Sequence, residues 1–282
     1  MAEIGGALFC GVESAARIER METAAMVGAV AAGRARVPAG GAFAREFGGG
    51  AACFAEVGSP LNKVVGIGFD GVPSAAEWET VEAAYAAVGV PVQVELAHLA
   101  DPRIGAELTG RGYRLVSFED VLGMEPAGRV WAAPAGVEVR RVDEDGFDTW
   151  LDIAVDGFAH PDDEGIPSHE EFPREALAAV MRDMASSNDT RTYVAYRDGV
   201  PAGAASMRVA GGIAALAGAA TLVAHRRHGV QTALLSTRLT EAAADGCDLA
   251  VVTTQPGSRS QRNVQGRGFS LLYTRAVLVK EV

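Results

Sequence analysis

The chain has 282 residues, of which 49% are hydrophobic and 22% are charged. This composition supplies a packed core for two domains of ordinary size or for one large domain, and it excludes a disordered protein. The formal net charge of -11 excludes a general nucleic-acid binder, because such a protein needs a positive field to attract phosphates.

The three cysteines are Cys10, Cys53 and Cys247, which lie far apart in the sequence and form no CxxC pair. This pattern predicts neither a disulfide framework nor a zinc site, and it fits a reducing compartment. The sequence shows no apolar run long enough to cross a membrane and no signal sequence at its start. We therefore expect a cytoplasmic protein, monomeric or homodimeric, that holds no metal and binds neither nucleic acid nor membrane.

The first half of the sequence predicts its elements less clearly than the second. Residues 14–32 have the pattern of one or two helices, and a further helix is predicted over 74–88. A strand over 90–96, a helix over 103–110 and a strand over 113–118 follow.

A segment rich in Gly, Pro and Ala divides the chain. Residues 123–136 have no helical or strand periodicity, so we interpret them as a linker between halves of similar size. This interpretation places one domain at residues 1–125, the linker at 126–136 and a second domain at 137–282.

The second half alternates strands and helices. A strand over 137–142 precedes helices over 143–158 and 171–185, and a hairpin over 192–209 turns at Asp198-Gly199. The remaining elements are a strand over 213–223, a helix over 231–244, a strand over 249–254, a helix over 258–266 and a strand over 270–279. This order predicts a mixed sheet with helices on both faces.

Two segments resemble each other at an offset of 156 residues, namely 108–122 and 264–278. A Gly-Arg-Gly run, which begins at Gly110 in the first and at Gly266 in the second, is identical, and an aromatic residue follows it both times. Such internal similarity favours a duplicated domain. The alternative is two unrelated helix-to-strand junctions that both use Gly before an aromatic residue.

Residues 221–235 have the pattern of an anion-binding loop. An apolar strand ends, a basic loop with Arg226, Arg227 and Gly229 follows, and a helix begins. The first amides of a helix have no internal partner and carry the positive end of the helix dipole. Gly229 lets the backbone approach a ligand closely, and the arginines can contact phosphate oxygens. A solvated basic turn is the alternative interpretation.

This loop resembles the cofactor loop of the GNAT acyltransferase superfamily, which has the pattern Gln/Arg-x-x-Gly-x-Gly/Ala between a strand and a helix. Arg226 and Gly229 match two marked positions, whereas Gln231 stands where the family has a small residue. The order of elements over 137–282 is similar to that fold, and 256–269 resembles its second cofactor segment. The resemblance implies an α/β (α+β) fold of two GNAT-like domains, each with a mixed, mostly antiparallel twisted sheet flanked by helices.

The resemblance also implies that acetyl-CoA is the co-substrate. Backbone groups of the strand would bind the pantetheine arm, amides of the loop would bind the pyrophosphate, and two polar side chains would lie beside the cofactor. The strand residues are Ala219, Ala220 and Thr221; the loop residues are Arg226, Arg227, His228, Gly229, Val230, Gln231 and Thr232; the polar residues are Ser260 and Asn263.

By the same resemblance, the primary amine of a small molecule attacks the thioester carbonyl directly. The enzyme would contribute positioning, an amide donor for the developing oxyanion, and proton transfer. Many family members have a tyrosine acid four residues before the Gly of the final Gly-Phe pair, and this chain has Val264 there. Tyr273 is the nearest substitute for the acid, with packing against the sheet as the alternative.

The matching loop of the first half, residues 70–75, lacks these features. It contains Asp70, which repels phosphate, and Pro73, which has no amide hydrogen. We therefore expect the second half alone to bind CoA, with the first half as a scaffold and a candidate wall of the acceptor pocket.

Residues 159–171 lie in a region that lines the acceptor pocket in the family. They include His160, His169 and several carboxylates, which would attract a cationic amine, and a solvated acidic loop is the alternative. No catalytic base is evident in the sequence. A non-catalytic acyl-CoA sensor or partner-binding module therefore stays open, as does a nucleotide-binding α/β domain without GxGxxG or Walker motifs.

Overall fold

The computed structural model describes residues 2–4, 7–160, 171–187 and 189–281 of the chain. The chain divides into two compact units, each assembled from separate segments. The first unit contains Met1–Leu122, Gly165–Ala176 and Thr253–Val282, and the second contains Gly123–Glu164 and Leu177–Val252.

The two units do not coincide with the two halves of the sequence, because Thr253–Val282 belongs to the first unit. The strand that ends the second half therefore completes the sheet of the first unit. The expected division into related domains at 1–125 and 137–282 stays a prediction.

The first unit is an α/β unit. Its elements are β1 (Ala2–Ile4), β2 (Ala7–Phe9), α1 (Val12–Arg36), β3 (Phe43–Phe47), β4 (Gly50–Phe54), β5 (Lys63–Val65), α2 (Ala75–Ala87), β6 (Val92–Ala97), α3 (Pro102–Gly110), β7 (Arg114–Met124), α7 (Arg259–Gln265) and β13 (Ser270–Lys280). Strands β1 and β2 form a separate antiparallel pair.

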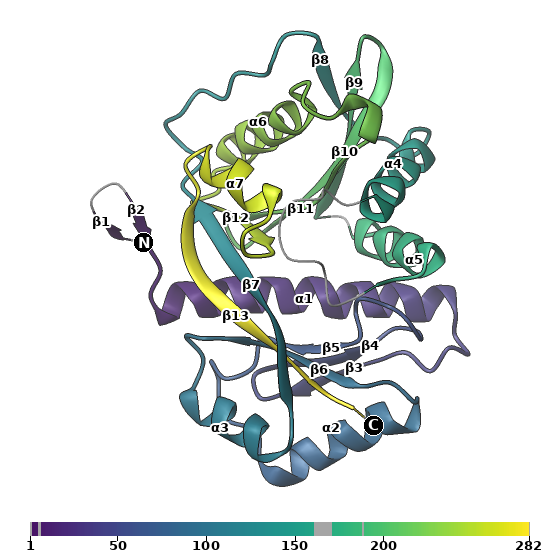
Figure 1. The fold of residues 1–282 in the computed structure, drawn as a ribbon, viewed down its shortest axis with the longest axis vertical. Helices are drawn as coiled ribbons and strands as arrows, with labels where there is room; N and C mark the ends of the chain where they lie inside the picture. The colour runs from purple at the N-terminus through teal and green to yellow at the C-terminus, as the bar shows by residue number, and fades with distance from the viewer. Residues whose placement is uncertain (1, 5–6, 161–170, 188, 282) are drawn as a thin grey trace. The chain divides into compact units, whose positions relative to one another are not determined.

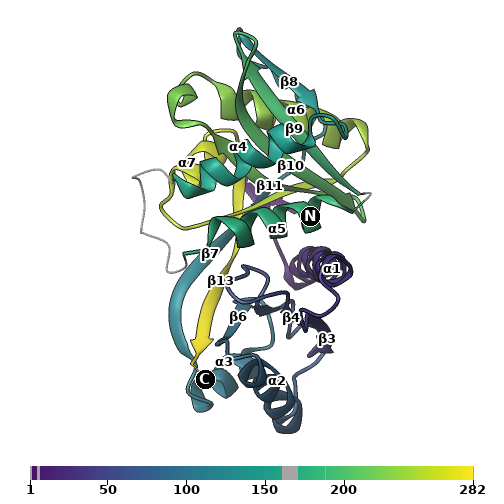
Figure 2. The ribbon, with the colours of Figure 1, turned by 90° about the vertical axis from the view of Figure 1, so that its right-hand side faces the viewer.

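The main sheet of the first unit has the strand order β3-β4-β5-β6-β13-β7. Its β5–β6 pair is parallel, whereas the pairs β3–β4, β4–β5 and β6–β13 are antiparallel. Helix α1 lies on one face of this sheet, and α2 and α3 lie on the other (Figures 1 and 2). Strand β13, from the end of the sequence, thus lies between β6 and β7, which come from the first half.

The apolar core of the first unit is centred on α2. Trp78 and Tyr85 are fully buried, and the Trp78 ring meets Phe47 edge-on with 4.6 Å between ring centroids. The Tyr85 hydroxyl donates to the Cys53 carbonyl over 2.6 Å. Burial of these large rings is the main stabilising contribution, because each aromatic side chain removes 150–250 Å² or so from water.

A buried charged network connects α1 with β13 in the same unit. The Arg275 guanidinium donates from Nε to Glu19 Oε1 over 2.7 Å and from Nη2 to the Glu22 carboxylate. The Tyr273 hydroxyl donates to the same Glu19 oxygen over 2.8 Å, and Glu119 of β7 lies 3.7 Å from Arg275 Nη1. One buried cation therefore faces three carboxylates, and the first two come from one face of α1.

Glu119 makes the stability of the first unit depend on pH. Burial, and next the charge of Glu95, raises the pKa of Glu119 to about 7, against the opposing charges of Lys63 and Arg275. Because the folded state binds this proton more tightly than the unfolded chain does, the free energy of unfolding falls as pH rises from about 4.3 to about 7.

We expect Glu119→Gln to raise the free energy of unfolding by about 1–3 kcal/mol at pH 8 and to leave it nearly unchanged at pH 4.5. Denaturant titrations of both proteins at the two pH values measure this difference. Glu281→Gln, at an exposed carboxylate, is the control. An effect of the same size at both pH values would contradict the prediction.

The second unit follows the order of elements expected for the second half. Its elements are β8 (Val137–Arg141), α4 (Phe147–Ala159), α5 (Arg174–Ala185), β9 (Thr190–Arg197), β10 (Val200–Ala210), β11 (Ile213–Thr221), η1 (Val223–His225), α6 (Val230–Ala244) and β12 (Leu249–Thr254). The strand order is β12-β11-β10-β9-β8, with a parallel β11–β12 pair and antiparallel pairs elsewhere.

Helices α4 and α6 cover opposite faces of these strands (Figures 1 and 2). The hairpin between β9 and β10 turns at Asp198 and Gly199, both with positive φ, as a type I′ turn requires. The expected α/β fold, with mixed, mostly antiparallel sheets flanked by helices, is confirmed. Among the helices of the described ranges, none has both the length and the apolar character needed to cross a membrane.

Candidate functional site

The predicted anion loop joins β11 to α6 within the second unit. The strand ends at Thr221, the short helix η1 follows, and Gly229 is the N-cap of α6. Arg227 has φ 65° and Gly229 has φ 82°, so two residues with positive φ lie on either side of His228. Left-handed residues in a turn are a common feature of anion-binding nests, in which successive N–H groups face one side, and we interpret this loop as such a nest.

The N-terminus of α6 has no side-chain cap among the described residues. Gly229, at the N-cap position, has no side chain that could accept a hydrogen bond from the first-turn amides. A Cβ on Gly229 would lie 3.0 Å from the Pro134 ring. Glycine therefore permits both the positive φ and the close packing against Pro134. The first-turn amides and the helix dipole therefore point at whatever anion occupies the nest.

The two arginines of the loop have different surroundings. Arg226 is partly buried, and its guanidinium donates from Nε to the Thr221 carbonyl over 3.3 Å and from Nη2 to the His160 carbonyl. Arg227 and His228 are exposed. Arg226 thus ties the loop to the ends of β11 and α4, and Arg227 is the arginine whose charge faces solvent.

The strand residues predicted to bind the pantetheine arm lie at an accessible edge. The last β11–β12 pair is Ala215 with Val251, so β11 continues beyond its pairing with β12. Ala219 is exposed and Thr221 is partly buried, whereas the methyl group of Ala220 is buried. An extended ligand backbone can pair with such an edge as an additional strand.

The equivalent loop of the first unit is closed to an anion. Helix α2 begins with a capping box, in which the Ser74 hydroxyl accepts from the Glu77 amide and the Glu77 carboxylate accepts from the Ser74 amide. Asp70 pairs with Arg20 at 3.3 Å. Two of the chain's own carboxylates, Asp70 and Glu77, therefore lie at or near the start of α2. That the first half binds no CoA stays a prediction.

Ser260 and Asn263, the other predicted cofactor contacts, lie on α7 in the first unit. Ser260 is exposed and Asn263 is partly buried. Val264, which stands at the position of the family's tyrosine acid, is 4% exposed and packs as a core residue. The cofactor roles of Ser260 and Asn263 stay predictions.

Tyr273, the predicted substitute for the acid, is 1% exposed. Its hydroxyl hydrogen is directed to Glu19, and burial is the main cause that raises the pKa of this phenol well above its usual range. A strongly raised pKa makes the phenol a weak acid near neutral pH. These surroundings favour the packing interpretation for Tyr273, and a catalytic role stays a prediction.

The predicted acidic acceptor region falls largely on residues 161–170, which lie outside the described residues. At its edges, His160 follows the last residue of α4, with Nδ1 3.6 Å from Asp156 Oδ1, and Glu171 is exposed. Across the described ranges, no group of three or more His, Cys, Asp or Glu side chains is arranged to hold a metal ion.

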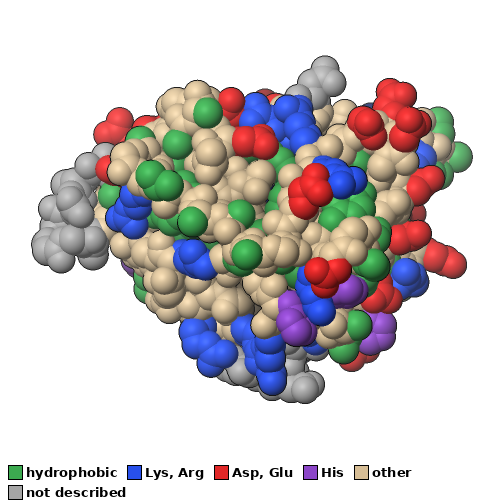
Figure 3. Space-filling view, turned by 90° about the horizontal axis from the view of Figure 1, so that it is seen from above, with side chains coloured by type: hydrophobic (Ala, Val, Ile, Leu, Met, Phe, Trp, Pro, Cys, Tyr) green, Lys and Arg blue, Asp and Glu red, His purple; other side chains and the backbone are tan. Residues whose placement is uncertain are grey.

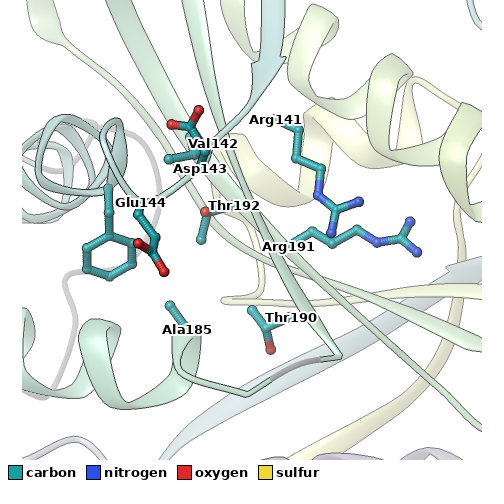
Figure 4. Close-up of a pocket in the computed structure, with 9 residues that line it drawn as sticks. Arg141, Val142, Asp143, Glu144, Ala185, Thr190, Arg191 and Thr192 are labelled. Carbon is teal, nitrogen blue, oxygen red and sulfur yellow. The ribbon is translucent and has the colours of Figure 1, made fainter.

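A separate hollow with a cavity volume of about 450 Å³ lies at the other end of α4. Figure 4 shows Arg141 and Arg191 side by side on one side of it and Glu144 on the opposite side. Arg191 is already paired with Asp245 at 2.6 Å and with Glu241 at 3.2 Å. The hollow contains none of the predicted site residues; its lining is Arg141, Val142, Asp143, Glu144, Phe147, Ala185, Thr190, Arg191 and Thr192.

Charged side chains of both signs are interspersed on the face drawn in Figure 3.

Sequence reasoning missed three residues that shape β11. Arg238 of α6 and Trp150 of α4 both donate to backbone carbonyls of the sheet, and Gly218 has φ 59° inside β11. Two signals in the sequence could have indicated them. Arg238 lies among Leu234 and Leu239 on an apolar helix face, and a Gly within a strand often marks a bulge.

Comparison with known proteins relates the second half to a family. Residues 149–269 match the sequence profile of the family described as Acetyltransferase (GNAT) family. The matched range includes the predicted anion loop, α6 and α7. A search among curated proteins finds no significant match.

Three solved structures resemble most of the chain. A GCN5-related N-acetyltransferase from Kribbella flavida has a TM-score of 0.62 and 23% identity, covering 89% of this chain and 95% of its own. A tandem GNAT protein from the clavulanic acid biosynthesis pathway has a TM-score of 0.59 and 16% identity, covering 94% and 95%. A GCN5-related N-acetyltransferase from Sphaerobacter thermophilus has a TM-score of 0.54 and 15% identity, covering 73% and 65%. These likenesses show the fold.

Proposed function

Because residues 149–269 match the model of the acetyltransferase (GNAT) family, we propose that this protein transfers an acetyl group from acetyl-CoA to a primary amine of a small molecule. The observation that carries the proposal is the loop before α6, where left-handed Arg227 and Gly229 precede an uncapped helix N-terminus. Backbone amides and a helix dipole at one point suit a pyrophosphate.

The accessible edge of β11 extends the same site. In the proposed complex, the pyrophosphate lies on the loop and the pantetheine amides pair with Ala219 to Thr221. Acetyl-CoA then brings its thioester to the part of β11 that has left its pairing with β12. We propose one cofactor loop per chain, because the capping box already uses the side chain of Glu77 at the start of α2 in the first unit.

In the proposed reaction, the neutral amine nitrogen attacks the thioester carbonyl carbon and forms a tetrahedral intermediate. The intermediate collapses with cleavage of the C–S bond, the amine loses one proton, and the CoA thiolate takes one. The protein's main contribution is to hold the two reactants in line and to stabilise the oxyanion with a backbone N–H. The acceptor is a neutral amine at the moment of attack, so the rate should rise with pH until the amine is deprotonated.

Binding of acetyl-CoA, measured by titration calorimetry, tests the cofactor part of the proposal. We expect Arg227→Glu combined with Gly229→Glu to weaken binding at least about 100-fold, or ~3 kcal/mol, because it adds negative charge to the nest and forces an unfavourable φ. The matched control is Gly128→Glu with Arg129→Glu, since Gly128 also has positive φ and both positions are exposed. Retention of full affinity by the loop variant would contradict the proposed site.

Turnover tests the catalytic part. Release of the CoA thiol is followed across a panel of small primary amines with the wild-type protein. Acetylation of one or more amines is expected, and the loop variant should lose it together with binding. Acetyl-CoA binding without thiol release on any amine would instead favour the sensor.

A further inference from the structure

Arg238 is a buried cation that has no carboxylate partner among the described residues. Its side chain belongs to α6 and is 3% exposed, and in the described part of the chain it forms no ion pair. Burial lowers the pKa of the guanidinium to about 10, so it still carries its proton at neutral pH. A buried charge of this kind costs several kcal/mol, and an apolar residue such as leucine would avoid that cost.

The guanidinium of Arg238 holds three backbone carbonyls. It donates from Nη1 to the Ser206 carbonyl over 2.9 Å and to the Ala217 carbonyl over 3.3 Å, and from Nε to the Leu234 carbonyl over 3.1 Å. Ser206 of β10 and Ala217 of β11 are register partners. The charge therefore sits at one defined step of the β10–β11 ladder.

That step is the start of a β-bulge. The next register pair after Ser206–Ala217 is Ala204–Ala220, so two residues of β11, Gly218 and Ala219, face one residue of β10. Gly218 adopts φ 59°, which a residue with a side chain disfavours. A bulge takes the extra residue out of the ladder and turns its backbone groups in a new direction.

The bulge is held from both faces of the sheet. On the α4 side, the buried Trp150 indole donates from Nε1 to the carbonyl of Ala205, the β10 residue opposite the bulge, over 2.9 Å. On the α6 side, Arg238 holds the carbonyls of the adjoining pair. Two large side chains from different helices thus fix a local distortion that weakens the ladder.

The hydrogen bond to Ala217 has a second consequence. The carbonyl of Ala217 and the N–H of Gly218 belong to the same peptide group. A cation that hydrogen-bonds the carbonyl oxygen polarises this group and makes its N–H a stronger donor. Ala217 is exposed, and the β11–β12 pairing has ended at Ala215.

We infer that Arg238 is a positioning residue for acyl transfer, which fixes and polarises the Ala217–Gly218 peptide so that the Gly218 N–H donates to the thioester oxygen of bound acetyl-CoA. This inference rests on the proposed function. As the amine attacks, negative charge develops on that oxygen, and the polarised N–H stabilises it. Arg238 itself touches no reactant and acts through one peptide group.

The carbonyl stretching band of [1-¹³C]acetyl-CoA tests the inference without a known acceptor. In the wild-type complex, the band should lie at lower frequency than in free acetyl-CoA, because a donor to the thioester oxygen weakens the C=O bond. In Arg238→Met, most of that displacement should disappear, while the dissociation constant for acetyl-CoA changes less than about threefold, since the loop supplies most of the affinity. Arg208→Met, at an arginine of β10 paired with Asp189, should keep the wild-type band.

If Arg238 has only a structural role, a variant that folds and binds acetyl-CoA will show the band at the wild-type frequency, and that result would overturn the inference. If Arg238→Met does not fold, Arg238→Gln replaces it, because glutamine keeps a hydrogen-bond donor and lacks the charge. An unchanged band in Arg238→Gln would likewise overturn the inference.

Two results with the wild-type protein are also decisive. A band that is not displaced in its acetyl-CoA complex would overturn the inference, whereas failure to bind acetyl-CoA would contradict the proposed function. With an amine that is turned over, kcat should fall about 10–100-fold in Arg238→Met at nearly constant KM for acetyl-CoA.

Discussion

Replacing Arg275 with methionine is expected to destabilise the first unit by about 3–5 kcal/mol. Arg275 is 3% exposed and provides the hydrogen bonds that its two α1 carboxylates accept, at 2.7 Å for Glu19. Methionine fills a similar volume and removes the charge, so the loss comes mainly from the Glu19 carboxylate, which stays buried and loses its cation. An unpaired buried charge costs more than the pair contributed, and this asymmetry makes the expected effect large.

The predicted loss depends on pH and on Glu19. Burial raises the pKa of Glu19, so the carboxyl that has lost Arg275 is expected to be protonated readily. The destabilisation should therefore shrink as pH falls, because a neutral Glu19 no longer needs a cation. Glu19→Gln in the Arg275→Met background should recover at least half of the loss at neutral pH.

Denaturant unfolding of the two single variants and the double variant forms the double-mutant cycle that measures this coupling. Arg114→Met is the matched control, since Arg114 is exposed and lies 3.7 Å from the equally exposed Glu281, and it should cost less than about 1 kcal/mol. A loss below that value for Arg275→Met, or additive losses in the double variant, would show that the network is not coupled as described.

The elements of the second half could be predicted because each carries its own boundary signals. The positive-φ pair at Asp198 and Gly199 sets the β9–β10 hairpin, and Gly246, with φ 73°, ends α6. Ser258 caps α7 by accepting from the Gln261 amide. These signals are local, so a single sequence is enough to read them.

Errors at element ends also have local causes. The helix expected over 143–158 begins at Phe147, because residues 143–146 form a turn in which the Gly146 amide donates to Asp143. The strand expected over 213–223 ends at Thr221, and the next residues form the short helix η1.

The first half was harder to predict because its early strands lack the usual pattern. Strand β4, with the sequence Gly-Ala-Ala-Cys-Phe, is buried at every position, so no alternation of polar and apolar residues appears. Strand β5 has three residues, and β3 places an arginine and a glutamate in exposed positions. Strand β7 continues to Met124, into the segment interpreted as linker.

The repeat at the two helix-to-strand junctions agrees with the structure. Gly112 and Gly268 have φ values of 86° and 94°, and the aromatic residue after each donates its amide to the helix five residues earlier. The same C-terminal helix motif thus ends α3 and α7. Because many unrelated helices end with this motif, the duplication stays a prediction.

Two features of the candidate site depend on contacts that no local pattern contains. Tyr273 is paired with Glu19, which lies 254 residues earlier in the chain, so its surroundings follow only from the tertiary fold. Arg238 could be flagged as a charge on an apolar helix face, but the carbonyls that it holds lie on β10 and β11. The loop was predicted because its glycine and helix start are adjacent in sequence.

The second prediction with a large expected effect concerns the contact between Gly157 of α4 and Ala220 of β11. A Cβ on Gly157 would lie 2.3 Å from the Ala220 Cβ, closer than packed atoms approach. Gly157→Ala is therefore expected to destabilise the second unit by about 1–3 kcal/mol, although alanine alone is the better helix former by about 1 kcal/mol. The same change should weaken acetyl-CoA binding, because it displaces the strand edge proposed to hold the pantetheine arm.

Combining Gly157→Ala with Ala220→Gly should restore both properties, because the double variant moves the methyl group across the contact without adding volume. The nearest remaining strand atom to the new Cβ would be Ala220 Cα, at 3.3 Å, which a small shift accommodates. Gly28→Ala is the matched control: this glycine is also helical, a Cβ on it would meet nothing within 4 Å, and the change should stabilise α1 slightly. Thermal unfolding and acetyl-CoA titration of the wild-type protein, Gly157→Ala, the double variant and Gly28→Ala measure the outcome. A double variant that stays as unstable as Gly157→Ala would show that the helix-to-strand contact is not what excludes a side chain at Gly157, whereas recovery of stability without recovery of affinity would separate the packing of α4 from the cofactor site.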